Sequence, residues 1–477
     1  MPLARSSQKP DSEDYTLCVL LMNRRLLCIS YRFPPEGYPL ATRVEYILGN
    51  LDTWQIDAIT AAEDGHIDDH VTTHHVAQRV RERVLSFLRR LHLGKLLDWL
   101  IWPDRFVFWI LPAYLKARRL VKRNEYDAIL VFMMPYSQGI VGLLLKQQTG
   151  LPLVLNLDDS LSCSDMHPTH PSRLHYELAR KLEDWYAQAT DAVVYVSERN
   201  MKRVRNRQPP GHRDKFHLIR RGAQQLPSPQ DGVRDEENFR IVYTGGTGGW
   251  YKFLEDEDTP SVPKRLYRAW KQLGTYTRTE LDHRTHGPIY VGQAVKKVID
   301  RRPAWSEKIS IDVYGPKYPE PVVNAVLDEH NLQEVVTLHG QVSHREALRH
   351  MTESDLLFMA LPDRIDGSPG GRISAKTYEY LMTDRPILAA LPPGENREYL
   401  RDKPGVSLTA PDGVEDMAAV IAEHAAATFA GDLVTVNRSA LRSSLSSTAR
   451  ARAFEEVLWD ALGDRKPAED PALARDA

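Results

Sequence analysis

The sequence predicts an α/β protein with two doubly wound, Rossmann-like domains. From residue 25 onward, short apolar runs typical of buried strands alternate with segments of helical periodicity. The alternation stops at a Pro-, Gln- and Ser-rich stretch, 227–232, and starts again at 239. The length agrees with this division, because 477 residues are too many for one hydrophobic core.

The first half of the chain begins in the order of a parallel sheet, with strand, loop, helix and strand in succession. Residues 76–123 are expected to be mostly helical, and the first domain is assigned to 1–232, with its core at 24–225. Strands are expected at 25–30, 56–60, 126–132, 151–157 and 192–196, and helices at 41–51, 137–148 and 175–188.

The second domain is assigned to 233–435. Its charged, poorly periodic segment 250–287 is interpreted as an insertion with a helix near 264–273, and a helix within 436–465 is expected to pack back on the first domain. Strands are expected at 239–244, 309–314, 335–338, 356–360 and 387–390, and helices at 289–301, 345–352, 373–382 and 446–462.

The composition is that of an ordinary globular protein, with 42% hydrophobic and 26% charged residues. A net charge of −2 gives no chain-wide signature of nucleic-acid binding. Three scattered cysteines form neither a disulfide framework nor a metal motif, which favours a reducing cytoplasm. The first apolar run, 15–22, is shorter than the roughly 20 residues that span a bilayer. A cytoplasmic location is therefore expected, and no histidine has the spacing of a metal ligand.

The most specific stretch is a glycine-rich loop, 367–371, directly before a helix. The free N–H groups and the dipole at such a helix start bind anions, above all phosphate. Lys376, one turn into the helix, adds a positive charge for a diphosphate. Glu379 follows on the same helical face, where its carboxylate can accept both hydroxyls of a ribose. The pattern alone leaves open the alternative that these two residues form only a surface ion pair.

Other loops follow predicted strands at the edge where open α/β sheets bind ligands. The glycines at 245–249 allow a backbone to approach a diphosphate closely, and Gly37 serves the same purpose from the other domain. Asp158 and Asp159 end a strand of the first domain. They are interpreted as orienting an acceptor or assisting as a base, and the alternative is a helix N-cap or loop turn.

Taken together, these segments resemble glycosyltransferase family 4. Residues 374–389 resemble the family's S-x-K-x-x-E-Y-L-x-x-x-x-P-I-L-A signature. Further landmarks follow in the family's order over roughly 25–460, at 31–37, 156–159, 194–198, 241–245 and 340–357. The resemblance implies the GT-B fold, in which two Rossmann-like domains face across a cleft and the donor lies on the C-terminal one.

The resemblance also implies roles for individual residues. Glu379 matches the family's ribose-binding glutamate, and Lys376 and Arg372 are expected to stabilise a leaving diphosphate. The expected catalytic residues are Lys376, Arg372 and Asp158. The expected contacts of the nucleotide-sugar are Glu379, Ser374, Gly371, Gly370, Gly245, Gly246, Lys252 and Gly315, and those on the acceptor side are Gly37, Asp159 and Ser197.

The sequence departs from the family at three places. Gly371 stands where many members carry a first glutamate, and Tyr38 replaces a second loop glycine. The Arg/Lys pair expected after the donor domain's first strand is not plainly present, and Lys252 is the nearest candidate, out of register.

Residues 79–123 combine many Lys and Arg residues with interleaved aromatic residues. This combination suits peripheral binding to an anionic membrane surface, here the inner face of the plasma membrane. The alternative is a helical pair that covers the N-terminal sheet with its aromatic side chains in the core.

The sequence therefore predicts a glycosyltransferase that moves a sugar from a nucleotide-sugar donor to a glycan or lipid-linked acceptor. The resemblance implies retention of anomeric configuration, no metal or other cofactor, and a role in cell-surface polysaccharide or glycoconjugate synthesis. Two alternatives remain at this point, a GT-B-like sugar-nucleotide epimerase and a non-catalytic binding protein.

Overall fold

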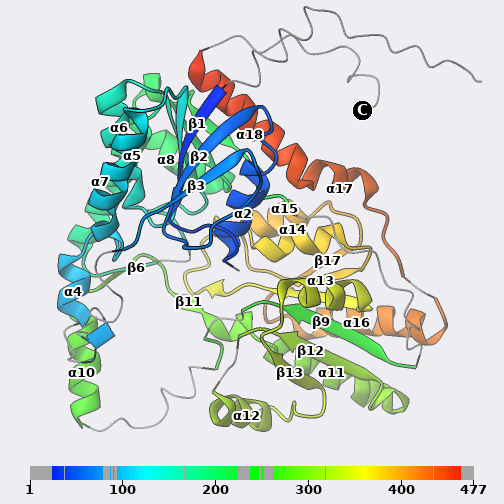
Figure 1. The fold of residues 1–477 in the computed structure, drawn as a ribbon. Coiled ribbons are helices and arrows are strands. Elements are labelled where there is room, and N and C mark those ends of the chain that lie inside the picture. Colours follow the sequence, from blue (N-terminus) through cyan, green and yellow to red (C-terminus); the bar gives the residue numbers. More distant parts are fainter. Residues whose placement is uncertain are drawn as a thin grey trace, which may run out of the picture.

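Two parallel β-sheets, one in each half of the chain, organise the computed structural model (Figure 1). The structure describes residues 24–36, 38–78, 86–87, 90, 94–165, 168–223, 237–246, 249–251, 262–316, 319–432 and 434–463. Among these, no helix is both long and apolar enough to cross a membrane.

The sheet of the N-terminal domain has seven strands in the order β3-β2-β1-β4-β5-β7-β8. Successive side chains of a strand point to opposite faces, so β1 contributes Leu27 and Ile29 to one core and Leu26 and Cys28 to the other. Helices α5 to α8 cover the first face, and α2 and α18 cover the second. The strands are β1 Arg24–Ile29, β2 Trp54–Thr60, β3 Val71–His75, β4 Ala128–Met133, β5 Leu153–Leu157, β7 Ala192–Tyr195 and β8 Phe216–Leu218. The helices are α2 Pro39–Leu48, α4 Gly94–Leu100, η1 Val107–Trp109, α5 Ile110–Val121, α6 Gln138–Thr149, α7 Arg173–Ala189, α8 Glu198–Arg207 and η2 Pro210–His212.

The C-terminal domain repeats this plan with six strands in the order β13-β12-β9-β14-β16-β17. One face is covered by α11, α12 and α16, and the other by α13, α14 and α17. The strands are β9 Phe239–Thr244, β12 Ile309–Tyr314, β13 Val336–Gly340, β14 Leu356–Ala360, β16 Ile387–Ala390 and β17 Val406–Thr409. The helices are α11 Ile289–Arg301, η4 Pro303–Trp305, α12 Glu320–Glu329, α13 His344–Glu353, α14 Ala375–Met382, α15 Glu395–Leu400, α16 Val414–Phe429 and α17 Ser439–Leu445.

The last described helix, α18 (Ser447–Leu462), returns to the N-terminal domain, as Figure 1 shows in red. Phe454 stacks on Phe132 of β4 at 6.1 Å between ring centroids, and Trp459 lies 5.4 Å from Trp54 of β2. These aromatic contacts join the end of the chain to the first sheet.

Part of the predicted insertion bridges the two domains. After α10 (Val262–Gln272), β10 (Tyr276–Thr277) pairs antiparallel with β6 (Thr169–His170) of the N-terminal domain. The following β11 (Leu281–Asp282) pairs with β15 (Asp363–Arg364) and leads into η3 (His283–His286).

The predicted fold class, two Rossmann-like domains of the GT-B type, is confirmed. The predicted elements did not include the outer strands β3, β8 and β17, the short strands β6, β10, β11 and β15, or the helices α8, α12, α15, α16 and α17. The expectation of a mostly helical stretch at 76–123 holds for α4, η1 and α5, whereas 101–106 is not helical. Pro103 lies in this break, and proline cannot donate an intrahelical hydrogen bond. The exact domain boundaries stay a prediction.

Candidate functional site

A cavity of about 400 Å³ lies between the two domains. On the N-terminal side it is lined by the loop after β1, the first turns of α2, and Arg221. On the other side it is lined by residues of α13 and α14, among them His344, Ala375 and Glu379. The start of α14 therefore faces the interdomain cavity, as the sequence predicted for a ligand-binding helix.

The first turn of α14 is held in place by a buried amide. Asn396 accepts hydrogen bonds from the Ser374 backbone N–H at 3.0 Å and from the Thr377 hydroxyl at 2.7 Å. Ser374 is the N-cap residue, but its side chain makes no capping hydrogen bond. The N–H of Thr377 donates to the Ser374 carbonyl at 3.0 Å, so the N–H groups of Ala375 and Lys376 are the donors of the first turn that stay available to a ligand.

Lys376 is buried beside this cavity, whose described lining includes neither Lys376 nor Arg372. Arg372 instead lines a smaller pocket next to Asp165 and Gly370. Its ammonium group donates a hydrogen bond to the hydroxyl of Tyr243 and lies 3.7 Å from the centroid of that ring. Burial, and then the nearby guanidinium of Arg372, lower the pKa of Lys376 well below its usual value. Within the described part of the chain, neither cation forms an ion pair. Two adjacent cations without a carboxylate partner favour a bound anion.

Glu379 lies further along α14, with 26% of its side chain exposed. One carboxylate oxygen is 3.9 Å from Nε2 of His344, and burial raises the pKa of Glu379. Because Lys376 is buried against Tyr243 and Glu379 faces the cavity, the pair is not the surface ion pair of the alternative interpretation.

The glycine loop after β9 passes directly beside Lys376. Gly245 has φ +99°, and a Cβ atom there would lie 3.5 Å from Cε of Lys376. The carbonyl of Gly246 accepts a hydrogen bond from Tyr243 at 3.1 Å. Gly315, after β12, donates its N–H to the carbonyl of Gly340 at 2.9 Å. These glycines lie near the cation site, whereas the predicted Lys252 and Gly37 lie outside the described residues.

The carboxylate of Asp158 forms ion pairs with two guanidinium groups. One carboxylate oxygen lies 3.0 Å from Nε of the fully buried Arg43, and the other accepts from Arg221. Asn156 donates to the first oxygen at 3.0 Å. This pairing does not favour the predicted base assistance, because the charge of the carboxylate is neutralised twice. Asp158 instead holds Arg221 at the wall of the cavity.

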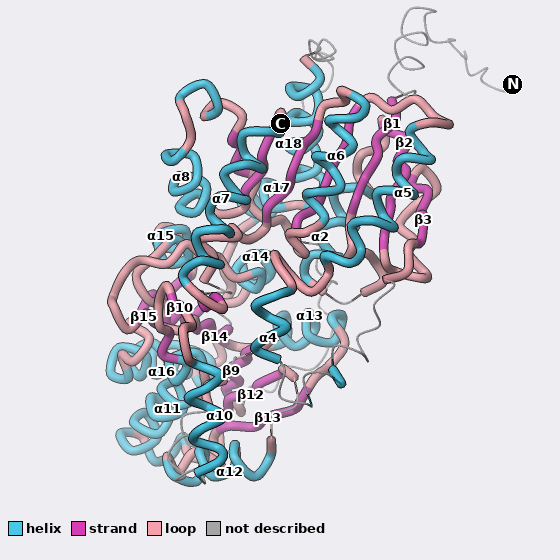
Figure 2. Tube along the Cα trace, turned by 90° about the vertical axis from the view of Figure 1, so that its left-hand side faces the viewer, coloured by secondary structure: helices cyan, strands magenta, loops and turns pink. Residues whose placement is uncertain are grey.

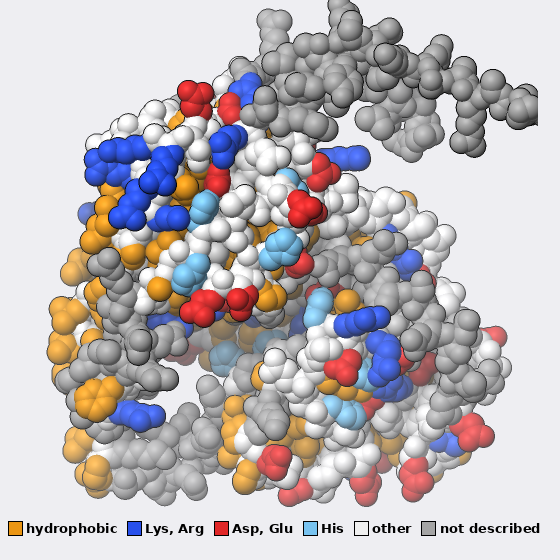
Figure 3. All heavy atoms as spheres, in the orientation of Figure 1, with side chains coloured by type: hydrophobic (Ala, Val, Ile, Leu, Met, Phe, Trp, Pro, Cys, Tyr) orange, Lys and Arg blue, Asp and Glu red, His pale blue; other side chains and the backbone are white. Residues whose placement is uncertain are grey.

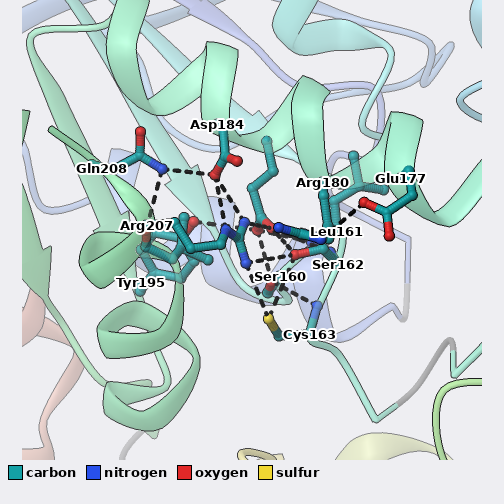
Figure 4. A network of polar contacts seen from close by, with 12 residues as sticks. Ser160, Leu161, Ser162, Cys163, Glu177, Arg180, Asp184, Tyr195, Arg207 and Gln208 are labelled. Carbon is teal, nitrogen blue, oxygen red and sulfur yellow. Dashed lines mark hydrogen bonds and ion pairs between the residues drawn. The ribbon is translucent and has the colours of Figure 1, made fainter.

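Asp159 and the loop that follows it rest on a buried carboxylate. Glu183 of α7 accepts hydrogen bonds from the Ser160 hydroxyl at 2.7 Å and from the Leu161 N–H at 3.0 Å. Arg207 of α8 pairs with the same carboxylate at 3.3 Å. Figure 4 shows this network around Ser160 and Arg207. It fixes the loop that carries Asp159 and, further on, Asp165.

Asp165 crosses from the N-terminal domain to the glycine loop before α14. Its carboxylate pairs with Arg364 and, at 3.2 Å, with Arg278, and it accepts from the Gly371 N–H at 3.1 Å. Gly370 and Gly371 therefore contact the N-terminal domain rather than the cavity around Glu379.

Gly371 also has a steric reason to be glycine. A Cβ atom there would lie 2.3 Å from Oδ1 of Asn200, a residue of α8 that is 2% exposed. The side chain of Asn200 thus occupies the space into which a family-type glutamate would project. The sequence revealed the missing glutamate but not its cause, because Asn200 is remote in the chain.

Ser197, predicted on the acceptor side, lies at a second crossing between the domains. It is the N-cap of α8, and its hydroxyl donates to Glu395 of the C-terminal domain at 2.7 Å. The carboxylate of Glu395 also accepts the N–H groups of Glu198 and Arg199, at 2.7 and 2.9 Å, and pairs with Arg220. Each domain thus inserts one carboxylate into the other.

Sequence reasoning missed three residues of the site. Arg221 follows β8, a strand that was not predicted, so its position at a strand end was hidden. Tyr243 lies within the landmark 241–245, but that pattern assigned no role to its side chain. His286 ends the insertion, is buried, and lies 3.4 Å from the Tyr243 hydroxyl. Burial, followed by Lys376 and Arg372, lowers its pKa well below the usual value, so its imidazole is neutral beside the two cations.

The two parallel sheets and the cavity between them make up a GT-B fold. Residues 52–222 match the model of the glycosyl transferase 4-like domain. This confirms the predicted resemblance to glycosyltransferase family 4. No curated protein sequence matches the chain.

Solved structures share the fold over nearly the whole chain. HepE from Anabaena in complex with UDP has a TM-score of 0.58 at 13% identity, covering 92% of this chain and 100% of that one. Sucrose-phosphate synthase from Thermosynechococcus elongatus has a TM-score of 0.56 at 13% identity, covering 92% and 99%. A glycosyltransferase from Rickettsia africae has a TM-score of 0.57 at 12% identity, covering 93% and 99%. At these identities the likeness shows the fold alone.

Proposed function

We propose that the chain is a glycosyltransferase that uses a nucleotide-sugar donor and retains the anomeric configuration. One observation carries the proposal, namely the two adjacent cations, Lys376 and Arg372, at the open start of α14. A nucleoside diphosphate carries the complementary charge, and the uncapped N–H groups add hydrogen-bond donors for it.

The geometry supports separate binding positions for the diphosphate and the ribose along α14. The diphosphate lies between the first turn, Lys376, Arg372 and Gly245. The ribose lies at Glu379, whose carboxylate accepts its hydroxyls from within the cavity. As the glycosidic bond breaks, negative charge grows on the diphosphate, and the two cations stabilise that charge where water is excluded.

The acceptor enters from the N-terminal side of the cavity in this proposal. Arg221, held by Asp158 and by the carbonyl of Pro39 at 3.2 Å, faces the donor helix across the cavity. A glycan or a lipid-linked sugar is the proposed acceptor, with cell-surface polysaccharide or glycoconjugate as the product. No bound metal or other cofactor is part of the proposal.

The test is a thermal-shift screen with UDP-, GDP-, ADP- and TDP-sugars on the wild type and on Glu379→Ala. A ligand that binds the native state raises its melting temperature by mass action. We expect one nucleotide class to raise the Tm of the wild type and to do so much less for Glu379→Ala. Glu329→Ala, an exposed carboxylate on α12, is the matched control and should respond like the wild type.

The fate of the sugar nucleotide that the screen selects separates the alternative functions. Conversion of the stabilising sugar nucleotide without an acceptor would indicate an epimerase, and binding without conversion would indicate a binding protein. Equal shifts in wild type and Glu379→Ala would remove the ribose contact from the proposal.

Peripheral association with the inner face of the plasma membrane through 79–123 is part of the proposal, within a cytoplasmic location. The end of helix α5 and the turn after it support it with exposed cations, Arg118 and Arg119 in the helix and Lys122 and Arg123 in the turn. Trp109 is buried in the core, as the structural alternative expected, whereas Trp99 is 42% exposed. Most of 79–93 lies outside the described residues.

A further inference from the structure

Helix α10, in the insertion of the C-terminal domain, exposes an apolar stripe. Its members are spaced by three or four residues and therefore share one helical face. They are Val262 at 67%, Leu266 at 67%, Trp270 at 52% and, just beyond the helix, Leu273 at 65% exposure. The remaining positions of 262–273 include Lys264, Arg265, Arg268 and Lys271 and no Asp or Glu.

Helix α4 of the N-terminal domain lies beside α10 and also exposes apolar side chains, together with the acid Asp98. Leu96, Trp99 and Leu100 are 51%, 42% and 72% exposed. Lys95 of α4 donates a hydrogen bond to the carbonyl of Trp270 at 2.6 Å and another to that of Leu273. These two bonds join the start of α4 to the end of α10.

The two helices lie on one side of the molecule, in line with α7. Figure 2 shows α7, α4 and α10 following one another on the face turned toward the viewer. Apolar side chains extend along the same edge in Figure 3. On α7 they are Leu174 and Trp185, at 61% and 50% exposure.

We infer that α4 and α10 together form a surface that binds an anionic lipid bilayer. Leucine and tryptophan on one helical face, in a segment whose sequence carries lysine and arginine but no acid, match an interface whose headgroups are negative and whose interior is apolar. A second copy of this chain fits less well, because two α10 helices would bring eight cations together without an acid.

The inference rests on the membrane association proposed above for 79–123, which includes α4, and extends it to the insertion, which no step of the transfer requires. Because α4 belongs to the N-terminal domain and α10 to the C-terminal one, a bilayer that binds both helices holds both domains. Bilayer binding would then fix the cleft relative to the membrane from both sides.

The test is co-sedimentation of the full chain with phosphatidylcholine vesicles that do or do not contain phosphatidylglycerol. We expect binding only to the anionic vesicles. The double variant Leu266→Glu/Trp270→Glu should lose more than about tenfold in affinity, because it loses apolar contact and gains two negative charges. The double variant Arg265→Gln/Arg268→Gln should lose about fivefold for each cation.

The matched control is Ile365→Glu, at a residue that is 68% exposed and lies outside α4 and α10, and it should bind like the wild type. The variants should unfold at the temperature of the wild type, because the side chains of Arg265, Leu266, Trp270 and Ile365 are exposed. Wild-type binding by Leu266→Glu/Trp270→Glu, equal binding to neutral vesicles, or no vesicle binding would overturn the inference. So would concentration-dependent dimerisation that this variant abolishes, since α10 would then bind a second copy.

Discussion

The substitution Lys376→Met removes a buried cation while keeping most of the volume of the side chain. The structure gives Lys376 a Tyr243 hydroxyl but no carboxylate, and burial lowers its pKa well below the usual 10.5. If the site exists to bind an anion, the empty protein is destabilised by this cation. Lys376→Met is therefore expected to stabilise the empty protein and to abolish donor binding.

The magnitude follows from proton linkage. The unfolded lysine keeps its proton up to a pH near 10.5, whereas the folded one loses it at lower pH. Stability of the wild type therefore rises with pH between the two pKa values, and the variant lacks that rise. Each unit of pKa lowering costs about 1.4 kcal/mol of folding free energy at pH values below both pKa values. The hydrogen bond of the charged ammonium that the variant loses is worth about 1.5–3 kcal/mol, so the cost of the buried charge outweighs it once the pKa falls by more than about two units.

The assay is thermal unfolding at neutral and alkaline pH, with and without the stabilising nucleotide. We expect the empty variant to melt a few degrees above the wild type at neutral pH, with the difference shrinking as the pH rises. Nucleotide should raise the Tm of the wild type only. Lys181→Met, on the exposed side of α7, is the control and should change neither quantity. A variant less stable than the wild type that still binds nucleotide would refute the reasoning.

Three further predictions concern the same region. Above the pKa that Lys376 has in the empty protein, donor affinity should weaken by up to about tenfold per pH unit, because diphosphate binding restores the proton on Lys376. Calorimetry in buffers of different ionisation enthalpy should show proton uptake on binding. An affinity that does not change with pH would contradict this prediction. Glu395→Gln should lower stability by about 2 kcal/mol or more, because Arg220 loses its buried partner, and an unchanged unfolding midpoint would exclude this role. Gly371→Ala should cost about 1–3 kcal/mol through its contact with Asn200, and Asn200→Ala in the same chain should recover part of it; additive effects in the double-mutant cycle would exclude direct contact.

Local sequence pattern was sufficient for most of the fold. Buried strands such as β1 and β9 are continuous apolar runs, and α14 follows a loop whose glycines mark its start. The outer strands were harder to recognise, since the five residues of β3, 71–75, include two threonines and two histidines and only one apolar residue. An edge strand is half-covered, so its sequence need not be apolar.

The candidate site was predictable only where its residues share one segment. Lys376 and Glu379 lie within one turn, and their spacing on a helix was visible. Asp165 and Asn200 meet the loop before α14 across the domain boundary, and no local pattern encodes that contact. Asp158 was placed correctly at a strand end, but its partners Arg43 and Arg221 come from distant segments. The ion pairs of Asp158 with these two arginines could therefore not be predicted from the sequence.

The central claim is that the start of α14, with Lys376 and Arg372, binds the diphosphate of a nucleotide. Hydrogen–deuterium exchange of the wild type, with and without the nucleoside diphosphate that stabilises it most, tests this claim at the residues concerned. The account predicts slower exchange in peptides covering 372–379 and 243–246, with α12 unchanged. Protection elsewhere with no change in those peptides, or no protection by any of the four nucleoside diphosphates, would contradict it.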